Sequence, residues 1–455
     1  MRVWIQRNAA IGLICVMGFW LNSVPVLAAD FFSIYQSAVT HDPDLQYAHL
    51  ETLASDEVRK QALADFLPSA SFQASRSQTL QKITSSDNTV FAVGNTNFGT
   101  NELTVKLSQP IFHFDSFIGY GQAKEKMRKA DAELSAARQD MMVRMLDAYL
   151  KALFTQDDQA RALREKDAVE SEVHLIRARH ASGQASNIEL KEAEAQMGTV
   201  ESLVVEANNA LENSLDDLKI LAGIPVDNID ALQGDILTMR PEPMDLNRWV
   251  KAASQQNFHV QAKKVAVEIA EDEISRQRAG HYPTIDLVGS YNYKDTNGTL
   301  FGGGSKVQTG TVGVDLNVPL SSGGRVLAKT REALLRRQQA QQELEKTRRQ
   351  AVRDARKAFT GVESSGAKLA ALKQSVAAQE SVVRAREKGV RSGLNTSTEV
   401  LNARKKLFIV HRDYARSRYN YLKDLIRLKR AAGTLSEKDM KAVNALFGTN
   451  DGGNS

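Results

Sequence analysis

Cysteine is almost absent from this chain of 455 residues, and the single copy, Cys15, lies close to the N-terminus. Because we expect residues 1–29 to be removed, the mature chain would contain no cysteine at all. This excludes disulfide bonds and thiolate-bound metals. Aromatic residues are also scarce, at 6% of the chain, which is typical of long helices with thin cores. The protein must therefore be held together by its packing and its partners.

A hydrophobic run long enough to cross a membrane as a helix is missing near the N-terminus. The apolar segment Ala9–Leu21 is shorter than the about 20 residues that a spanning helix needs. It follows Arg2 and Arg7 and precedes the small-residue sequence Val26–Ala29, which is the arrangement of a secretory signal. We therefore predict a signal peptide over residues 1–29. The alternative is a single transmembrane anchor.

No large excess of charge of either sign is present. Charged residues make up 25% of the chain and hydrophobic residues 42%, so it is neither disordered nor a helical protein with many membrane spans. The formal net charge of +5 includes Arg2 and Arg7, which belong to the predicted signal. The remaining excess is too small to indicate a nucleic-acid partner.

What the sequence does contain is a very long helical pattern. No proline interrupts residues 323–392, and about 70 residues at about 1.5 Å each would form a rod about 100 Å long. Its apolar heptad consists of Val362, Leu369, Val376, Val383 and Val390. An earlier rod, at about 119–182, has a similar line through Met142, Tyr149 and Leu163. Patterns of this length indicate a coiled coil or a helical repeat.

The chain contains the same unit twice. The segment Ala38–Pro68 resembles Ala253–Pro283, and the pair Ser182-Gly183 returns as Ser392-Gly393. Such duplication means that one supersecondary unit is used two times. We divide the chain into a first copy at 30–230, a linker at 231–245, a second copy at 246–435, and a short helix with a tail at 436–455.

Each copy begins with a predicted helix of about 30 residues that ends before Pro68 or Pro283, because proline cannot continue a helix. A β-hairpin follows, at about 68–112 or 283–320. A helical hairpin completes the copy, with its tip at 182–187 or 392–397. The returning helices are shorter than the outgoing rods, so we expect the first helix of each copy to complete the far half of the rod. Candidate N-caps of the returning helices are Ser186 or Asn187 and Thr396 or Ser397.

The predicted β-hairpins show the alternation of transmembrane β-strands. In one strand the apolar Val312, Val314 and Leu316 alternate with Thr311, Gly313 and Asp315. Loops rich in polar residues are expected at 81–100 and 294–306. Apolar-out and polar-in alternation over about 10 residues is the signature of an outer-membrane barrel strand. The alternative is a soluble hairpin with one face on a core.

Four strands cannot close a barrel, and unpaired strand edges are not tolerated in lipid. Several chains must therefore share one barrel. Three chains would supply twelve strands, an even number within the range of such barrels. The residues thus predict a homotrimer in contact with outer-membrane lipid.

No motif of an enzyme or a cofactor site is found. The chain lacks the GxSxG, HExxH and P-loop patterns, and its eight histidines are scattered without ligand spacing. The run Gly302–Gly304 is not followed by the helix and lysine that phosphate binding requires. We therefore expect no catalysis, no cofactor and no metal.

At several positions the sequence resembles the TolC-like outer-membrane factors, the exit ducts of tripartite efflux pumps and type I secretion systems. The most specific stretches are Tyr419–Leu422 and Ala432–Asp439, and Val318–Gly324 also fits. The resemblance covers essentially the whole mature chain. It implies an α+β membrane protein with duplicated halves. Its four transmembrane strands per chain would contribute to a trimeric twelve-stranded β-barrel, continued by a long antiparallel coiled-coil α-barrel.

The same resemblance implies a location and partners. The chain would lie in the outer membrane of a Gram-negative bacterium, with most of its mass in the periplasm. A periplasmic adaptor and an inner-membrane transporter of RND, ABC or MFS type would open its periplasmic end. Neither the transporter nor the cargo, whether drugs, toxins or proteins, follows from the sequence. The alternative, a periplasmic coiled-coil adaptor or scaffold without a pore, would have one helical hairpin flanked by soluble β-domains.

Adaptor docking is implied at the two hairpin tips. The matching residues are Ser182, Gly183 and Gln184 at the first tip and Ser392, Gly393 and Leu394 at the second. The family carries valine where this chain has serine. The location of docking is therefore retained while its chemistry changes.

The resemblance also implies an aperture beside the second tip. Glu399 and Asn402 match two aspartates that ring the closed aperture in this family. Because asparagine carries no charge, a trimer would keep one acidic ring and bind cations more weakly than a two-ring aperture. From the residues alone, Glu399 and Glu189 are solvated acids in the first turn of a helix, where the helix dipole favours them.

A link between hairpins holds the closed state in the family. Glu189 matches its carboxylate, but the tyrosine and arginine positions are Val390 and Asn395 here. The link cannot form as the family makes it. Arg391 is the nearest candidate substitute.

Overall fold

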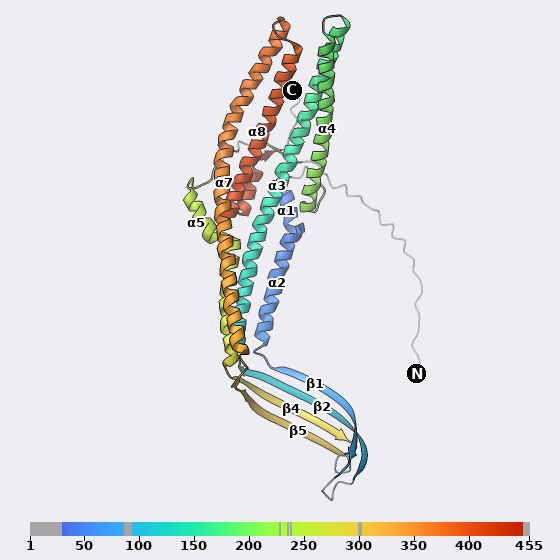
Figure 1. Ribbon diagram of the computed structural model, residues 1–455, viewed down its shortest axis with the longest axis vertical. Coiled ribbons are helices and arrows are strands. Elements are labelled where there is room, and N and C mark those ends of the chain that lie inside the picture. Colours follow the sequence, from blue (N-terminus) through green and yellow to red (C-terminus); the bar gives the residue numbers. More distant parts are fainter. Residues whose placement is uncertain are drawn as a thin grey trace, which may run out of the picture.

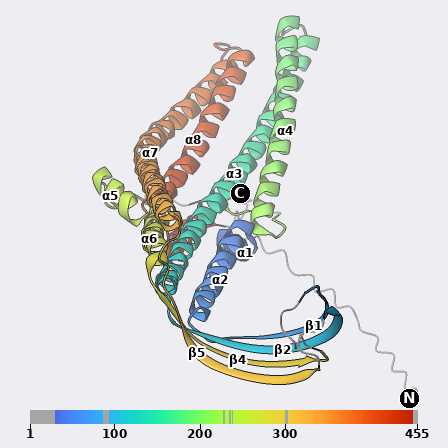
Figure 2. The ribbon, with the colours of Figure 1, turned by 60° about the horizontal axis from the view of Figure 1, so that its bottom comes forward.

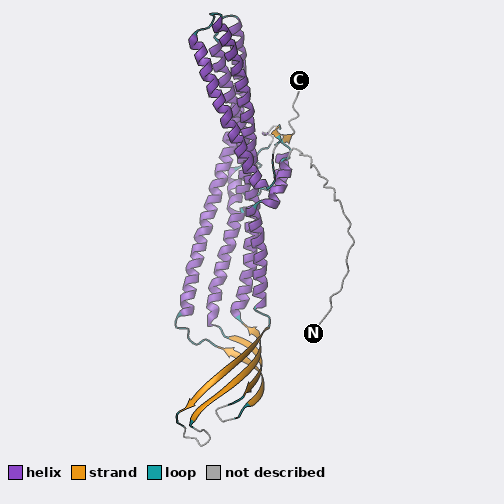
Figure 3. Ribbon diagram, turned by 90° about the vertical axis from the view of Figure 1, so that its right-hand side faces the viewer, coloured by secondary structure: helices purple, strands orange, loops and turns teal. Residues whose placement is uncertain are grey.

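The computed structural model describes residues 30–85, 93–226, 229–233, 236, 239–298 and 303–448. Long helices make a rod, and a sheet extends from one end of it (Figure 1, Figure 3). The predicted signal at 1–29, with Cys15, lies outside the described residues, as does the end of the tail at 449–455. Among the described helices, none has both the length and the apolar character to cross a membrane.

The two predicted rods are single helices. α3 spans Phe114–Ala181 and α7 spans Arg325–Arg391, with 68 and 67 residues. The shorter helices α4 (Asn187–Ala222) and α8 (Ser397–Ala431) return alongside them as antiparallel hairpins. Because neither rod contains proline, nothing interrupts its backbone hydrogen bonds.

The prediction of one continuous helix at the start of each copy was wrong. The first copy has α1 (Phe31–His41) and α2 (Pro43–Ala64), and the second has α5 (Leu246–Gln256), α6 (Phe258–Arg278) and the 3-10 turn η2 (Ala279–His281). The Asp42 carboxylate accepts a hydrogen bond from the Leu45 amide at 2.8 Å. The Asn257 side chain accepts one from the Val260 amide at 3.3 Å. A side chain that satisfies free N–H groups starts a new helix at each point.

Four antiparallel strands form the sheet in the order β1-β2-β4-β5. They span Ser69–Ile83 (β1), Gly94–Phe112 (β2), Thr284–Thr296 (β4) and Ser305–Asn317 (β5). The strands reach further than predicted, since β1 and β2 take up much of the loop expected at 81–100. Polar Thr96 joins the ladder opposite Gln81, because backbone pairing does not require apolar side chains.

One face of the sheet is apolar and the other is polar. Phe72, Val105 and Tyr291 lie side by side across three strands. The same face continues with Leu103, Leu107, Ile285, Leu287, Val312, Val314 and Leu316. Phe72 is 68% exposed, and no described part of the single chain covers this face. The sheet is also curved (Figure 2), as a segment of a barrel wall would be.

The helices lie in a row whose members change along the rod. Toward the hairpin tips, successive contacts join α7, α8, α3 and α4; toward the sheet, they join α7, α6, α3 and α2. α4 lies roughly in line with α2 (Figure 1), so the first helices complete the far half of the rod as expected. Among the helices of this row, α7 therefore forms one lateral edge and α4 with α2 forms the other, and the short helix α5 packs on α7 outside the row (Figure 1).

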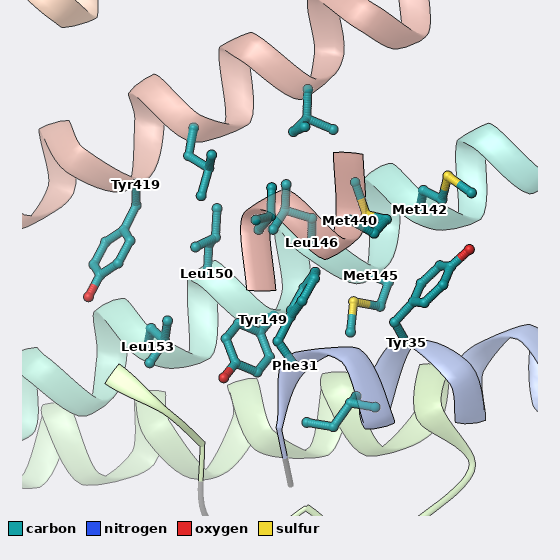
Figure 4. Close-up of a cluster of buried hydrophobic side chains, with 14 of the residues drawn as sticks. Phe31, Tyr35, Met142, Met145, Leu146, Tyr149, Leu150, Leu153, Tyr419 and Met440 are labelled. Atoms are coloured by element: carbon teal, nitrogen blue, oxygen red, sulfur yellow. The ribbon is translucent and has the colours of Figure 1, made fainter. Parts of the chain in front are cut away.

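The main hydrophobic core lies where the two halves of the rod meet. Phe31 and Tyr149 pack edge to face with ring centroids 5.0 Å apart, and Phe447 packs on both rings. Figure 4 shows side chains from α1, α3, α8 and α9 (Glu437–Asn444) converging there. The short strands β3 (Ala231–Leu232) and β6 (Phe447–Gly448) pair beside them. The region predicted as a linker therefore contributes to the core.

The heptad line of the first rod does not continue as predicted. Met142 and Tyr149 are buried, but Leu163 is 42% exposed. Nearer the tip, the buried positions of α3 are instead Val169, Val173 and Ile176, in one cluster with residues of α4. A straight α-helix drifts about 20° per heptad from a strict seven-residue repeat, so the buried line moves to other positions.

Candidate functional site at the hairpin tips

Each tip is a short turn between two long helices. Gly183, with φ of +74°, and Gly393, with φ of +73°, take the left-handed conformation. The amide after each glycine donates back into the last turn of the rod, from Gln184 to the Arg179 carbonyl at 2.7 Å and from Leu394 to the Gly389 carbonyl at 2.8 Å. This combination is the Schellman end of a helix. Both tips therefore have the same local construction.

The returning helices begin with capping boxes. The Ser186 hydroxyl accepts from the Glu189 amide at 3.2 Å, and the Glu189 carboxylate accepts from the Ser186 amide at 2.8 Å. Thr396 and Glu399 make the same pair of bonds, both at 3.3 Å. Of the candidate caps, the structure thus selects Ser186 and Thr396. Reciprocal bonds of this kind fix both acids to the first turn of their helices.

Glu399 also lies at the centre of a small polar cluster. The Asn395 side chain donates to its carboxylate at 2.6 Å, and an Arg386 nitrogen lies 2.8 Å from the same oxygen. These contacts lower the pKa of Glu399, and the hydrogen bond from Asn395 is the largest cause. The carboxylate is thus ionised but already paired. Sequence reasoning missed Arg386 because no local pattern connects the two helices of the hairpin.

The other candidate residues near the aperture take separate positions. Val390 is partly buried, and Arg391 is exposed at the end of α7. Within the part of the chain that the structure describes, Arg391 forms no salt bridge with Glu189, so a link between the hairpins through Arg391 stays a prediction. Glu189 and Asn402 instead line one cavity of about 240 Å³ between the hairpins, together with Lys405.

The tips expose apolar side chains rather than free hydroxyls. Leu394 is 82% exposed, and Ile188, in the first turn of α4, is 71% exposed. The Ser182 hydroxyl donates to the Arg179 carbonyl at 3.0 Å, and the Ser392 hydroxyl makes a similar bond within its own helix. A partner would therefore meet apolar surface at the tips. Among the described residues, no group of three potential metal ligands gathers anywhere.

A family model for outer membrane efflux proteins matches residues 34–223 and 249–434. The chain belongs to the outer membrane efflux protein family. The two matched segments correspond to the duplicated halves of the rod and sheet. Among relatives of this efflux protein, the proteases secretion protein PrtF of Dickeya chrysanthemi is 28% identical over 97% of this chain and 96% of its own length. The outer membrane protein TolC of Vibrio cholerae is 27% identical, covering 93% of this chain and 95% of that protein.

Solved structures of outer-membrane channels share the fold. The Campylobacter jejuni channel CmeC matches with a TM-score of 0.76 at 15% identity, covering 92% of this chain and 90% of that one. CusC matches with a TM-score of 0.75 at 14% identity, covering 90% and 92%. At such identities the match shows the fold alone. Family and fold together confirm the predicted function: this efflux protein is an outer-membrane exit duct, in a family of channels rather than enzymes.

Proposed function

We propose that three copies of this efflux protein form one duct, with a shared twelve-stranded barrel in the outer membrane and the helices in the periplasm. The observation that carries the proposal is the four-stranded sheet, whose outer strands β1 and β5 each have one unpaired edge and whose apolar face is uncovered. Unpaired edges leave polar backbone groups unsatisfied in lipid, so they must meet the edges of other copies. Three copies give an even strand number in the range of such barrels.

We also propose that the hairpin tips dock a periplasmic adaptor, which couples the duct to an inner-membrane transporter. The exposure of Leu394 and Ile188 supports this, because apolar side chains at an exposed tip are stabilised when a partner covers them. Glu399 lies one turn beyond Leu394 and would face its counterparts in the other copies. Docking and gating would then occur within the same two turns of helix.

Cell fractionation and electrical recording test the duct. The mature chain should be recovered in the outer membrane, and the purified protein should give discrete conductance steps in a planar bilayer. Recovery in the soluble periplasm, without conductance, would support a scaffold without a pore instead.

The names of two relatives favour a secreted protein as the cargo. PrtF and the alkaline protease secretion protein AprF of Pseudomonas aeruginosa, 27% identical over 91% of this chain, are both named for protease secretion. We therefore propose that this duct serves a type I secretion system. A strain lacking the chain should lose a secreted protein from its culture medium. An unchanged set of secreted proteins with lower drug resistance would indicate efflux instead.

A further inference from the structure

The duplication relates contacts inside one chain to contacts between chains. α3 corresponds to α7 and α4 to α8, and the pairs Tyr149–Phe359 and Glu189–Glu399 set the register without a gap. Inside the chain, α3 contacts α8 and α6. In a closed ring of identical chains, α7 takes the place that α3 has inside one chain, and it contacts α4 and α2 of the next chain. These are the helices that form the two lateral edges of the single chain.

The seam inside the chain is largely apolar. Leu146 of α3 is buried in the same core as Leu422 and Ile426 of α8 (Figure 4 shows Leu146). Directly beside this contact, the Asp147 carboxylate pairs with Arg427. The α3–α8 seam thus combines leucine-type packing with ion pairs, which also include Asp140 with Arg430 at 2.6 Å and Asp147 with Lys423 at 3.8 Å.

The equivalent positions at the two free edges carry charges of opposite sign. The α7 positions equivalent to Val143, Leu146 and Asp147 of α3 hold Arg353, Arg356 and Lys357. The α4 positions equivalent to Leu422, Ile426 and Arg427 of α8 hold Glu212, Asp216 and Asp217. All six charged side chains are exposed in the single chain. The edge formed by α7 therefore carries three cations, and the edge formed by α4 carries three anions at the positions that would face them.

We propose that neighbouring chains are joined by ion pairs. These pairs connect Arg353, Arg356 and Lys357 of one chain with the three α4 acids of the next chain. The inference rests on the trimer proposed above. The pair Lys357–Asp217 repeats, with the signs exchanged, the Asp147–Arg427 pair inside the chain. Asp217 already contacts Lys151 at 2.7 Å, but both side chains are more than half exposed and such a pair contributes little.

The charge of the whole edge helices agrees with this pairing. α7 contains seventeen lysine and arginine residues and seven acids, a formal charge of +10, whereas α4 contains two lysines and eight acids, a formal charge of −6. Opposite potentials guide association and fix its register. Charge also has an advantage over leucine at this edge, because an unassembled chain would otherwise expose a long apolar stripe to water.

Cysteine cross-linking tests the proximity directly. The chain without residues 1–29 contains no cysteine, so a variant with both Lys357→Cys and Asp217→Cys has two reactive thiols. A short bismaleimide should convert this variant into covalent dimers and trimers on a denaturing gel. The control pairs Lys357→Cys with Glu57→Cys, an exposed position on α2 toward the sheet, and should stay monomeric.

A charge exchange tests the ion pairs. Changing Arg353, Arg356 and Lys357 to glutamate should lower the temperature at which the detergent-solubilised trimer dissociates. Changing the three α4 acids to lysine should do the same, and combining both sets should restore the wild-type temperature. As a matched control, glutamate at Arg164, Lys406 and Lys438, exposed on non-edge helices, should leave it unchanged.

The outcomes separate this inference from the assembly on which it rests. A wild-type protein that is not a trimer contradicts the proposed assembly itself. If the wild type is a trimer, two results overturn the seam alone: cross-linking no greater than in the control pair, or a combined exchange that dissociates no later than either triple variant.

Discussion

Gly183 and Gly393 hold a backbone conformation that makes any side chain costly, and both tips depend on it. The left-handed conformation costs an L-residue about 1–2 kcal/mol. By contrast, Gly198 lies inside α4, where an added Cβ would meet no atom within 4 Å. The same residue type is therefore required at the tips and dispensable in the returning helix.

Gly393→Ala should reduce the free energy of unfolding by about 1–2 kcal/mol and speed amide exchange at the second tip. Gly198→Ala should instead stabilise the protein by about 0.5–1 kcal/mol, because alanine favours a helix. Thermal unfolding and hydrogen exchange measure both. Equal effects of the two changes would contradict the role given to the tip glycine.

Glu399 offers a second test at the residue scale. If it rings the aperture, Glu399→Ala should weaken the block of single-channel currents by multivalent cations. Arg386→Ala should strengthen the block, because it frees a carboxylate that the arginine now pairs at 2.8 Å. Unchanged block in Glu399→Ala would remove this residue from the aperture.

The lowered pKa of Glu399 also predicts a pH dependence. A carboxyl whose pKa is lower in the folded chain stabilises it above the unfolded-state pKa, and that contribution is lost as the pH falls through the folded-state pKa. Acidification over that range should therefore lower the protection of amides in the first turn of α8, measured as the exchange rate relative to an unfolded chain at the same pH. Glu399→Gln should show the lower protection already at neutral pH, with no further loss of protection on acidification.

At the scale of elements, the break between α1 and α2 depends on Asp42. This side chain is 1% exposed, caps α2, and accepts two hydrogen bonds from Arg144 at 2.7 and 2.8 Å. One acid thus ends one helix, begins the next and holds both against α3. In the second copy, Asn257 caps α6 and donates to the Ala431 carbonyl at 3.0 Å instead.

Asp42→Ala should reduce the free energy of unfolding by about 2–4 kcal/mol, because the cap and the charge-assisted bonds are lost together. Asp42→Asn keeps an oxygen that can cap the helix and should cost clearly less. Thermal unfolding of both variants distinguishes the two contributions. If Asp42→Ala were no worse than Asp42→Asn, the cap would not explain the break.

At the scale of the whole molecule, one core connects segments from both copies and from the C-terminus. Tyr149 is fully buried there, and its hydroxyl donates to the Asp230 carbonyl at 3.1 Å. Tyr149→Ala should reduce the free energy of unfolding by about 3–5 kcal/mol, since removal of a large core side chain leaves a cavity. Tyr149→Phe should cost about 1 kcal/mol for the lost hydrogen bond. Thermal unfolding in detergent compares them, and a small loss in Tyr149→Ala would show that this core does not unite the halves.

The sequence by itself determined the duplication, the proline-free rods, the alternating strands and the positions of the tips. These features are periodic or local, so neighbouring residues are enough to reveal them: Gly183 and Gly393 mark the turns, and the apolar spacing around Val312 marks a strand face. The prediction of one continuous first helix was wrong because Asp42 and Asn257 act as caps. Asp and Asn also occur at positions where they do not cap a helix, so the residue type alone does not reveal a cap.

Only the tertiary structure decided which distant segments meet. The pairing of Leu232 with Phe447 joins the predicted linker to the C-terminal end, and the contact of Arg386 with Glu399 crosses a hairpin. Neither has a local pattern, because the first joins two short strands far apart along the chain and the second joins two helices that face each other across a turn. The opposite charges of α7 and α4 can be counted in the sequence. They indicate an interface only because the fold places these two helices at the two edges.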